Sequence, residues 1–341
     1  MKKVNWGIIG LGAIASQFAR GFKFSNNARL KGVASKENKK IENFKSSFQI
    51  EDNYCFNNYE DLLKCKEIDI IYIALPNSLH HKWILKCIEN NKKILVEKPA
   101  TLNFSEIENI NQDYDIKSIF FAEAFMYRYH PQILKVVDLI NDKIIGDIVS
   151  MKTCFGKDIL SKKNFFGIKR KKKINVNNRL FNKELGGGAI LDLGCYTVSL
   201  SILVASLISK IDINNVKLIN KKKEYAVTGV DVDSYAEIKF DNNFTSYIGA
   251  SFTKNLGKKT EIIGSNGKII IEDTWHGKPS ILRIIKETDK EITIEAEENI
   301  YFYEIDFLSK NILAGKKKPD FPGMTFDDSL INMSIIQEWL K

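Results

Sequence analysis

The feature that most constrains the fold of this chain is a glycine turn close to its start. An apolar run over 4–9 ends at Gly10, and a helical pattern with apolar residues at i and i+4 spacing begins soon after it. A strand, a G-x-G-x-x-A turn and a helix in this order are typical of a cradle for a dinucleotide pyrophosphate. Gly10 permits the tight turn, Gly12 lets the backbone approach the phosphates, and Ala15 lets helix and strand pack closely. With the free N–H groups at the helix start, the predicted cofactor contacts are Gly10, Gly12, Ala13, Ile14 and Ala15.

Strand and helix signals alternate over about the first 120 residues. The runs 68–75 and 93–96 are continuously apolar, as parallel strands buried on both faces usually are. We expect strands at 4–9, 29–34, 69–75, 93–96 and 118–122, and helices at 13–24, 37–47, 58–65, 79–90 and 104–112. This alternation predicts an α/β domain with a doubly wound parallel sheet, the Rossmann arrangement.

The pattern changes near residue 146, where strand-like runs follow one another with few helices between them. The expected strands are 148–155, 234–240, 245–251, 259–263, 268–271, 281–285 and 291–296. One apolar helix is expected near 188–207, and a last helix begins at Thr325, which forms a capping box with Asp328. We therefore expect two domains: a dinucleotide-binding domain over 1–122 and an α+β domain with an antiparallel or mixed sheet over 123–341.

The charge balance is basic but does not indicate a nucleic-acid-binding protein. The formal net charge of the 341-residue chain is +9, and nearly all of its basic residues are lysines, a bias typical of A+T-rich genomes. The densest basic run, 169–173, lies in a loop-like segment without interleaved aromatic residues that could stack on bases. Its side chains either stay solvated or attract an anionic substrate, such as a sugar phosphate or nucleotide sugar.

Cysteine usage and hydropathy bound the cellular setting. The five cysteines are scattered, without a Cys-x-x-Cys pair or a Cys/His cluster at metal spacing, so we expect a reducing, cytoplasmic setting and no metal site. The first residues resemble a short signal peptide, but glycines interrupt the apolar run and cleavage would destroy the first strand and helix. No other stretch approaches the roughly 18 apolar residues of a membrane span, so we expect no membrane contact.

Two segments that follow buried strands predict further cofactor contacts. The second strand ends at Ala34-Ser35-Lys36, where a site for NAD usually carries an acidic residue for the ribose hydroxyls. A hydroxyl and a cation suit a 2′-phosphate, so we favour NADP over NAD; alternatively, Ser35 and Lys36 only open the next helix and Glu37 contacts the ribose. After the strand over 69–75, Ser78 is a candidate helix cap. The predicted cofactor contacts of this segment are Leu75, Pro76, Asn77 and His80.

Two further motifs carry chemistry. Glu97-Lys98-Pro99 directly follows the strand over 93–96, which places Lys98 at the ligand-binding edge of the sheet, although a solvated turn lysine would give the same tripeptide. Farther along, three glycines lead into an apolar helix in which Asp192 and Tyr196 share a face at i and i+4. An aspartate in an apolar helix needs a partner, and Lys98 is a natural one.

In this order, the motifs resemble those of the glucose-fructose oxidoreductase / inositol dehydrogenase (Gfo/Idh/MocA) family. The resemblance covers essentially the whole chain and is greatest to the branch of NADP-dependent D-xylose dehydrogenases and dihydrodiol dehydrogenases. The segments that carry it are 10–15, 74–80, 97–99, 123–131, 187–196, 262–267 and 322–325. It implies a second domain with a large open, mostly antiparallel sheet, through which subunits pair as a homodimer or homotetramer.

The resemblance also implies roles for single residues. Lys98 matches the catalytic lysine of the family, with Glu97 beside the cofactor, and Asp192 matches an aspartate that orients the substrate. Many members of the family carry histidine four residues after this aspartate, whereas this chain carries Tyr196 there, as the xylose and dihydrodiol dehydrogenase branch does. The implied substrate contacts are Met126, Arg128, Phe155, Asp192 and Tyr196.

The activity implied by these roles is hydride transfer between NADP, with NAD possible, and a CH–OH or C=O carbon of a sugar, sugar derivative or polyol. Tyr196 would donate or accept the proton, Lys98 would assist it electrostatically, and Asp192 would position both lysine and substrate. The alternative is a dinucleotide-binding sensor or transcriptional regulator of the same fold that catalyses nothing.

Overall fold

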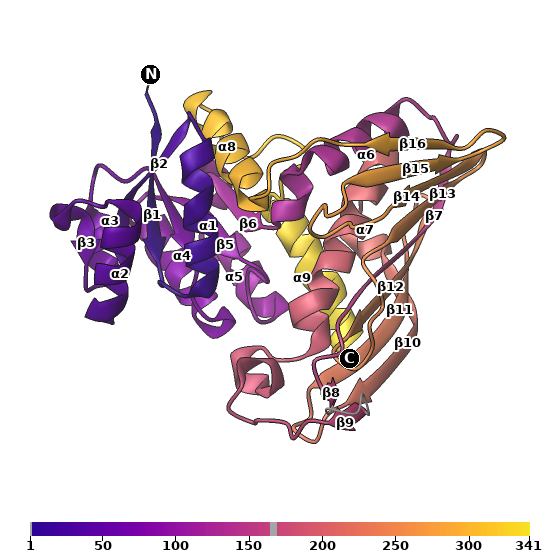
Figure 1. Ribbon diagram of the computed structural model, residues 1–341, viewed down its shortest axis with the longest axis horizontal. Helices are drawn as coiled ribbons and strands as arrows, with labels where there is room; N and C mark the ends of the chain where they lie inside the picture. The colour runs from indigo at the N-terminus through magenta and orange to yellow at the C-terminus, as the bar shows by residue number, and fades with distance from the viewer. Residues whose placement is uncertain (1, 164–168) are drawn as a thin grey trace. The chain divides into compact units, whose positions relative to one another are not determined.

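The first strands of the chain form a six-stranded parallel sheet in the computed structural model, which describes residues 2–163 and 169–341 (Figure 1). In sheet order they are β3 (Cys55–Phe56), β2 (Ala28–Ala34), β1 (Val4–Ile9), β4 (Ile70–Ile73), β5 (Lys93–Glu97) and β6 (Phe121–Ala124). The strand order reverses between β1 and β4, which is the switch point where such sheets bind ligands at their carboxyl ends. The predicted doubly wound sheet is confirmed; β3 is not among the predicted strands because two residues leave no pattern.

The helices that accompany this sheet follow the predicted ranges closely. They are α1 (Ala13–Ala19), α2 (Asn38–Phe48), α3 (Tyr59–Lys64), α4 (His80–Glu89) and α5 (Phe104–Asp113). The helix predicted over 13–24 is an α-helix only up to Ala19 and then continues as a 3-10 helix. Aromatic packing holds α1 on the sheet, since the Phe18 and Tyr72 rings stack with centroids 4.0 Å apart and Trp6 lies 5.7 Å from Phe18.

The chain divides into two compact units, each built from two stretches of sequence. The first unit comprises the chain up to His130 together with 297–330, and the second comprises 131–296 together with 331–341. The division predicted from the sequence, at 122/123, assigns residues 297–330 to the second domain, whereas they belong to the first unit. Chain order alone does not show which sheet a late helix covers.

Helix α8 (Ile300–Leu313) is the element that makes this return. Its residues Ile305 and Leu308 are fully buried in the core of the first unit. The Trp6 indole N–H donates a hydrogen bond of 2.9 Å to the Ser309 hydroxyl. The helix is therefore tied to β1 both by apolar packing and by a buried polar contact.

The second unit contains an eight-stranded sheet. In sheet order its strands are β10 (Lys217–Tyr225), β11 (Asp231–Lys239), β12 (Thr245–Ser251), β7 (Ile148–Gly156), β13 (Thr260–Gly264), β14 (Gly267–Ile271), β15 (Ile281–Ile285) and β16 (Lys290–Thr293). The β12/β7 pair is parallel and the other neighbouring pairs are antiparallel, which confirms the expected mostly antiparallel sheet. The edge strand β10 escapes prediction because lysines dominate it, a common way of protecting a sheet edge.

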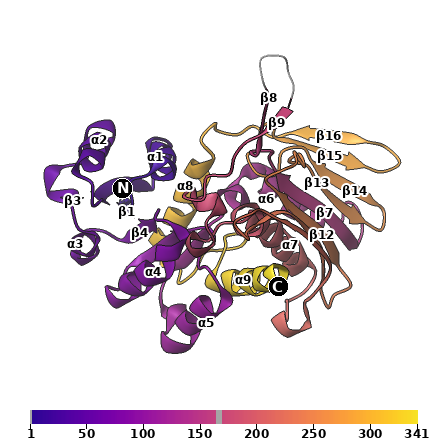
Figure 2. The same cartoon turned by 90° about the horizontal axis from the view of Figure 1, so that it is seen from below.

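Helices cover one face of this second sheet (Figure 2). Helix α7 (Cys195–Ile208) contacts β7 and β12, and α6 (Pro131–Asn141), which the sequence pattern does not predict, packs on α7. The helical stretch over 183–208 is long and apolar enough to cross a membrane by length and composition, contrary to the expectation from the sequence. However, 78% of its most apolar window is buried inside the protein, as in the core helix of a globular domain.

Two local predictions have different outcomes. The capping box at the last helix, α9 (Phe326–Leu340), is confirmed: the Thr325 N–H donates to the Asp328 carboxylate at 3.1 Å and the Asp328 N–H to the Thr325 hydroxyl at 3.2 Å. The loop expected for the basic run is wrong, because β9 (Lys169–Lys171) pairs with β8 (Ser161–Lys163) as a hairpin. The residues between these two strands lie outside the described part of the chain.

Candidate functional site

The glycine turn between β1 and α1 has the form of a phosphate cradle. Gly10 has a φ of +88°, and a Cβ atom there would lie 2.5 Å from the Ala74 carbonyl oxygen, so both conformation and space demand glycine. Gly12 is the N-cap residue of α1, and no described atom lies within 4 Å of the place a Cβ would take. The first turn of α1 carries neither an acidic residue nor a side-chain cap, which leaves its N–H groups available to an anion. A dinucleotide pyrophosphate fits this turn.

The end of β2 carries the residues predicted to choose between NAD and NADP. The Ser35 side chain is buried, and its hydroxyl oxygen accepts a hydrogen bond of 3.1 Å from the Glu37 N–H. Lys36 is exposed, whereas Glu37 forms an ion pair with Lys40 at 2.5 Å. Ser35 therefore shapes the turn before α2, as in the alternative interpretation, while Lys36 offers an accessible cation at this edge.

The segment after β4 lies at the same carboxyl edge of the sheet. Leu75 and Asn77 are buried, and Pro76 between them is exposed. The prediction that Ser78 caps the next helix is wrong: α4 begins after Leu79 and has no side-chain cap, because a short 3-10 helix precedes it and replaces the capping turn. Cofactor contacts of the other three residues stay a prediction.

His80, the first residue of α4, is fully buried. Its Nδ1 atom lies 2.8 Å from the Pro99 carbonyl oxygen, and its Nε2 atom lies 2.8 Å from the Leu75 carbonyl oxygen. Burial and the charge of Lys98 lower the pKa of His80, although the two carbonyl oxygens act in the opposite direction. Because both ring nitrogens contact the backbone, His80 ties the segment after β4 to the turn that contains Lys98.

Glu97, the last residue of β5, is anchored from inside the first unit. Its carboxylate accepts a hydrogen bond from the hydroxyl of the buried Tyr72. Burial and the nearby Glu97 raise the pKa of Tyr72 well above its ordinary value, so the phenol stays protonated and donates. Glu304 of α8 is also buried, and burial followed by the charge of Glu97 raises its pKa well above the usual range for a carboxyl. The residue before Lys98 is thus held by a buried polar cluster.

Met126 and Arg128 lie on the 3-10 helix that follows β6. The Arg128 side chain is only 1% exposed, and its guanidinium donates to the Pro322 carbonyl at 3.2 Å and to the Asp328 carboxylate at 3.3 Å. These contacts fasten the start of α9 within the first unit and argue against a substrate contact by Arg128. A contact between substrate and Met126 stays a prediction.

In the second unit, the three glycines before the apolar helix let a neighbouring turn come close. The Gly187 N–H donates to the Asn182 carbonyl at 2.9 Å, and the Gly188 N–H donates to the Leu180 carbonyl at 3.0 Å. A Cβ atom on Gly187 would lie 2.7 Å from the Arg179 carbonyl oxygen, so a larger residue would push this turn away. The motif therefore serves packing in this unit and brings Arg179 next to the helix start.

Asp192 lies in a short π-helical stretch, Ile190–Gly194, which continues into α7. Such stretches often occur at functional sites. Two nitrogens of the Arg179 guanidinium lie 3.3 Å from one oxygen of the Asp192 carboxylate. The Asp192 side chain is 15% exposed and that of Arg179 is 55% exposed, so the pair lies at the surface of the unit. Arg179, a residue that the sequence pattern does not single out, is thus an ionic partner of Asp192.

A second aspartate caps the helix that carries Asp192 and Tyr196. The buried Asp231 carboxylate accepts hydrogen bonds from the Ile190 N–H at 2.9 Å and from the Ser234 hydroxyl at 3.1 Å. Burial raises the pKa of Asp231, and these hydrogen bonds offset part of the rise. Gly188 has a φ of +118°, and a Cβ there would collide with the Asp231 carboxylate.

Tyr196, 7% exposed, belongs to an aromatic cluster of the second unit. Its ring meets Phe155 edge to face at a centroid distance of 5.4 Å and lies 5.7 Å from Trp275. Phe155 and Trp275 stack at 5.3 Å, and His276 lies 6.0 Å from Phe155. The predicted residues Phe155 and Tyr196 are therefore brought together, and Trp275 and His276 join them from a loop more than seventy residues away, which no local signal reveals.

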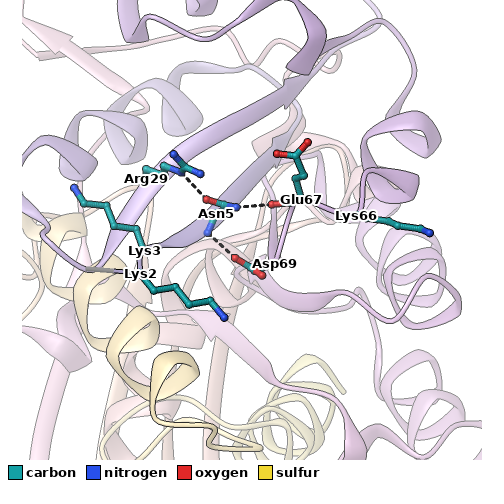
Figure 3. A pocket seen from close by; sticks show the side chains of 7 residues that line it. All are labelled: Lys2, Lys3, Asn5, Arg29, Lys66, Glu67 and Asp69. Atoms are coloured by element: carbon teal, nitrogen blue, oxygen red, sulfur yellow. Dashed lines mark hydrogen bonds between the residues drawn. The ribbon is translucent and has the colours of Figure 1, made fainter.

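Two other features of the described residues do not point to a site. Within 2–163 and 169–341, no group of three or more His, Cys, Asp or Glu side chains is arranged to hold a metal ion. A pocket of about 580 Å³ opens where the parallel strands begin, and there the Asn5 side chain bridges Arg29 and the Glu67 carbonyl (Figure 3). Because ligands of such sheets bind at the carboxyl ends of the strands, this pocket lies at the wrong edge for the cofactor. Its lining residues are Lys2, Lys3, Asn5, Arg29, Lys66, Glu67 and Asp69.

Comparison with known families identifies the class of protein that this fold and these sites define. Residues 4–118 match the model of an oxidoreductase family with an NAD-binding Rossmann fold, and residues 133–270 match the GFO/IDH/MocA C-terminal domain. The chain belongs to the GFO/IDH/MocA oxidoreductase family. The resemblance noted from the motifs is thereby confirmed, and so is an NAD(P)-binding first domain.

Individual relatives match three quarters or more of this chain, at low identity. The trans-1,2-dihydrobenzene-1,2-diol dehydrogenase of Xenopus tropicalis is 26% identical over 98% of this chain and 97% of its own length. D-xylose 1-dehydrogenase (NADP(+)) 2 of Haloferax volcanii is 22% identical over 76% of this chain and 75% of its own. The crystal structure of aldose-aldose oxidoreductase from Caulobacter crescentus covers 99% of this chain and 96% of its own, with a TM-score of 0.84 and 18% identity, which establishes a common fold.

Proposed function

We propose that this protein is an NADP-dependent dehydrogenase or reductase of a sugar, a sugar derivative or a related polyol. The observation that carries the proposal is the arrangement around Tyr196: a phenol within an aromatic cluster, one helical turn after an aspartate that an arginine holds. Support for the substrate class comes from the names of the relatives, a diol dehydrogenase and a D-xylose dehydrogenase.

We assign the proton transfer to Tyr196. A bound nicotinamide would accept or supply the hydride, and the oxygen of the reacting carbon must lose or gain a proton in the same reaction. The Tyr196 hydroxyl is the group proposed to exchange this proton, and the cation of Lys98 would favour the phenolate form that appears during the exchange. Asp192, which Arg179 holds, is proposed to orient the substrate through its hydroxyl groups.

We infer a preference for NADP from Ser35 and Lys36, the two residues that follow β2. Lys36 is exposed and so is available to a 2′-phosphate, and the Ser35 hydroxyl lies in the same turn. The D-xylose dehydrogenase relative carries NADP(+) in its name, which supports the same choice. The phosphates of the dinucleotide are assigned to the turn at Gly10 and Gly12.

The test of the proposed function is the variant Tyr196→Phe. Phenylalanine retains the ring that packs on Phe155 and Trp275, so the aromatic cluster and the fold should survive. We expect kcat with an active sugar to fall by about 10²–10⁴-fold, the usual contribution of general acid–base catalysis, with unchanged NADPH binding. Turnover within a few-fold of the unmodified protein would reject Tyr196 as the proton-transfer residue.

We also propose that the protein forms a homodimer or homotetramer through the open face of the eight-stranded sheet. Tyr247 and Ile263 are 45% and 39% exposed, and they alternate along their strands with the buried Ile248 and Ile262. They therefore point to the face opposite α7. Light scattering should give the mass of two or four chains, and Tyr247→Lys with Ile263→Lys should give one; a monomeric unmodified protein would reject the proposal.

A further inference from the structure

Both polar atoms of the peptide group between Pro99 and Ala100 are held by buried side chains. The Pro99 carbonyl oxygen lies 2.8 Å from His80 Nδ1, and the Ala100 N–H donates a hydrogen bond of 2.9 Å to the Glu123 carboxyl. His80 is 0% exposed and Glu123 is 1% exposed. One comes from the start of α4 and the other from β6, so two different elements grip the same peptide group.

His80 is oriented by a second contact on its far side. Its Nε2 atom lies 2.8 Å from the Leu75 carbonyl oxygen, so the ring is held between two carbonyl oxygens. A neutral imidazole donates to only one of them, and the clamp requires the tautomer with the proton on Nδ1, which faces the Pro99 carbonyl oxygen. The ring therefore acts as a rigid spacer between the segment after β4 and the turn that follows β5.

Glu123 is held on the sheet directly beside the same turn. It pairs in register with Val96 of β5, two residues before Lys98. Burial raises the pKa of Glu123 to about 7, while the Ser329 hydroxyl, the Ala100 N–H and the charge of Arg128 limit the rise. A buried carboxyl of this kind is costly to retain unless it has a task that an apolar side chain would not perform.

We propose that His80 and Glu123 are positioning residues for Lys98, acting together as a clamp on the Pro99–Ala100 peptide group. The proposal rests on the role of Lys98 in the proposed function. A lysine carries its amine on a flexible stem of four carbons, so the amine can be placed accurately only if the backbone beneath it is fixed. The clamp fixes that backbone from both sides within the first unit, and neither His80 nor Glu123 needs to contact the substrate.

The clamp predicts a specific pattern of turnover among variants. We expect His80→Gln and Glu123→Ala each to lower kcat about tenfold and to change the Kd of NADPH by less than about threefold, since the glycine turn is untouched. Glu123→Gln should keep most of the activity, because its amide oxygen can still accept from the Ala100 N–H. His81→Gln is the matched control, with the same substitution one residue along α4, and it should leave kcat unchanged.

A double-mutant cycle separates positioning from general destabilisation. In a Lys98→Ala background, His80→Gln and Glu123→Ala should lower the residual kcat by less than about twofold, because the group they position is gone. If His80→Gln and Glu123→Ala instead lower kcat about tenfold in the Lys98→Ala background, as they do when Lys98 is present, the proposal is overturned.

Hydrogen exchange at Ala100 tests the clamp without turnover. With alanine-selective isotope labelling, Glu123→Ala should speed exchange of the Ala100 N–H at least tenfold, whereas Glu123→Gln and His81→Gln should not. Unchanged exchange in Glu123→Ala would refute the clamp. Fast exchange in Glu123→Ala together with no turnover by the unmodified protein would instead support the clamp and reject the proposed function.

Discussion

Replacing Gly188 by alanine should damage the second unit in two separable ways. The φ of +118° lies in a region that alanine adopts only with strain, which costs roughly 1–3 kcal/mol. The new Cβ would also collide with the Asp231 carboxylate and displace it from the Ile190 N–H. The lost charged hydrogen bond is worth about 1.5–3 kcal/mol, so the whole change should lower the free energy of unfolding by about 2.5–6 kcal/mol.

The companion variant Asp231→Ala removes the cap without touching the glycine. It leaves the buried Ile190 N–H without its acceptor, and we expect it to lower the free energy of unfolding by about 2–4 kcal/mol. In the double variant there is no carboxylate left to collide with, and only the strain at Gly188 is added. The double variant should therefore be about 1.5–3 kcal/mol more stable than the sum of the single changes indicates.

Urea unfolding followed by tryptophan fluorescence measures this coupling. Two of the four tryptophans, Trp275 and Trp339, lie in the second unit, and Trp339 lies against Gly194, so part of the signal reports on the region that changes. The slope of the transition should be similar in all four proteins. Free energies of unfolding that add to within about 0.5 kcal/mol would refute the reasoning, because they would show that Gly188 and Asp231 do not interact.

Two further predictions concern the first unit. NADPH should bind more tightly than NADH, and Lys36→Gln should weaken NADPH binding about tenfold while leaving NADH binding unchanged; equal loss for both cofactors in a fluorescence titration would reject the 2′-phosphate contact. The pKa of Glu123, raised by burial to about 7, means that the folded state binds this proton more tightly than the unfolded chain. Its contribution to stability is therefore present below pH 4.5 and is lost as the pH rises towards 7, by up to roughly 3 kcal/mol. Glu123→Gln should remove this part of the pH dependence, and parallel stability curves for the two proteins from pH 5 to 8 would contradict the assignment.

Features that depend on neighbouring residues could be predicted from the sequence. The turn at Gly10 and Gly12 could be placed because a strand, two glycines and a helix follow one another without interruption between residues 4 and 19. The capping box of Thr325 and Asp328 could be placed for the same reason. In these cases the partners are close in the chain, so spacing alone contains the information.

Features that depend on distant residues could not be predicted in this way. Arg179 is an ionic partner of Asp192 that no local pattern singles out, and Asp231 caps a helix that begins about forty residues earlier. Trp275 lies in the loop after β14, a strand of the same sheet that α7 covers, and it meets Tyr196 of α7 only through this sheet. Side chains that meet through sheet order leave no periodic signal along the chain, and the positioning contacts of the site are mostly of this kind.

The most direct test of the central claim is to incubate the purified protein with NADP⁺ and a panel of aldoses, polyols and cyclic diols and to follow NADPH formation by absorbance. The proposed function predicts NADPH formation with at least one sugar or diol by the unmodified protein, and a loss of about 10²–10⁴-fold in Tyr196→Phe. Tight NADPH binding without turnover of any carbohydrate or diol, in either direction, would contradict it and would favour a dinucleotide sensor of the same fold.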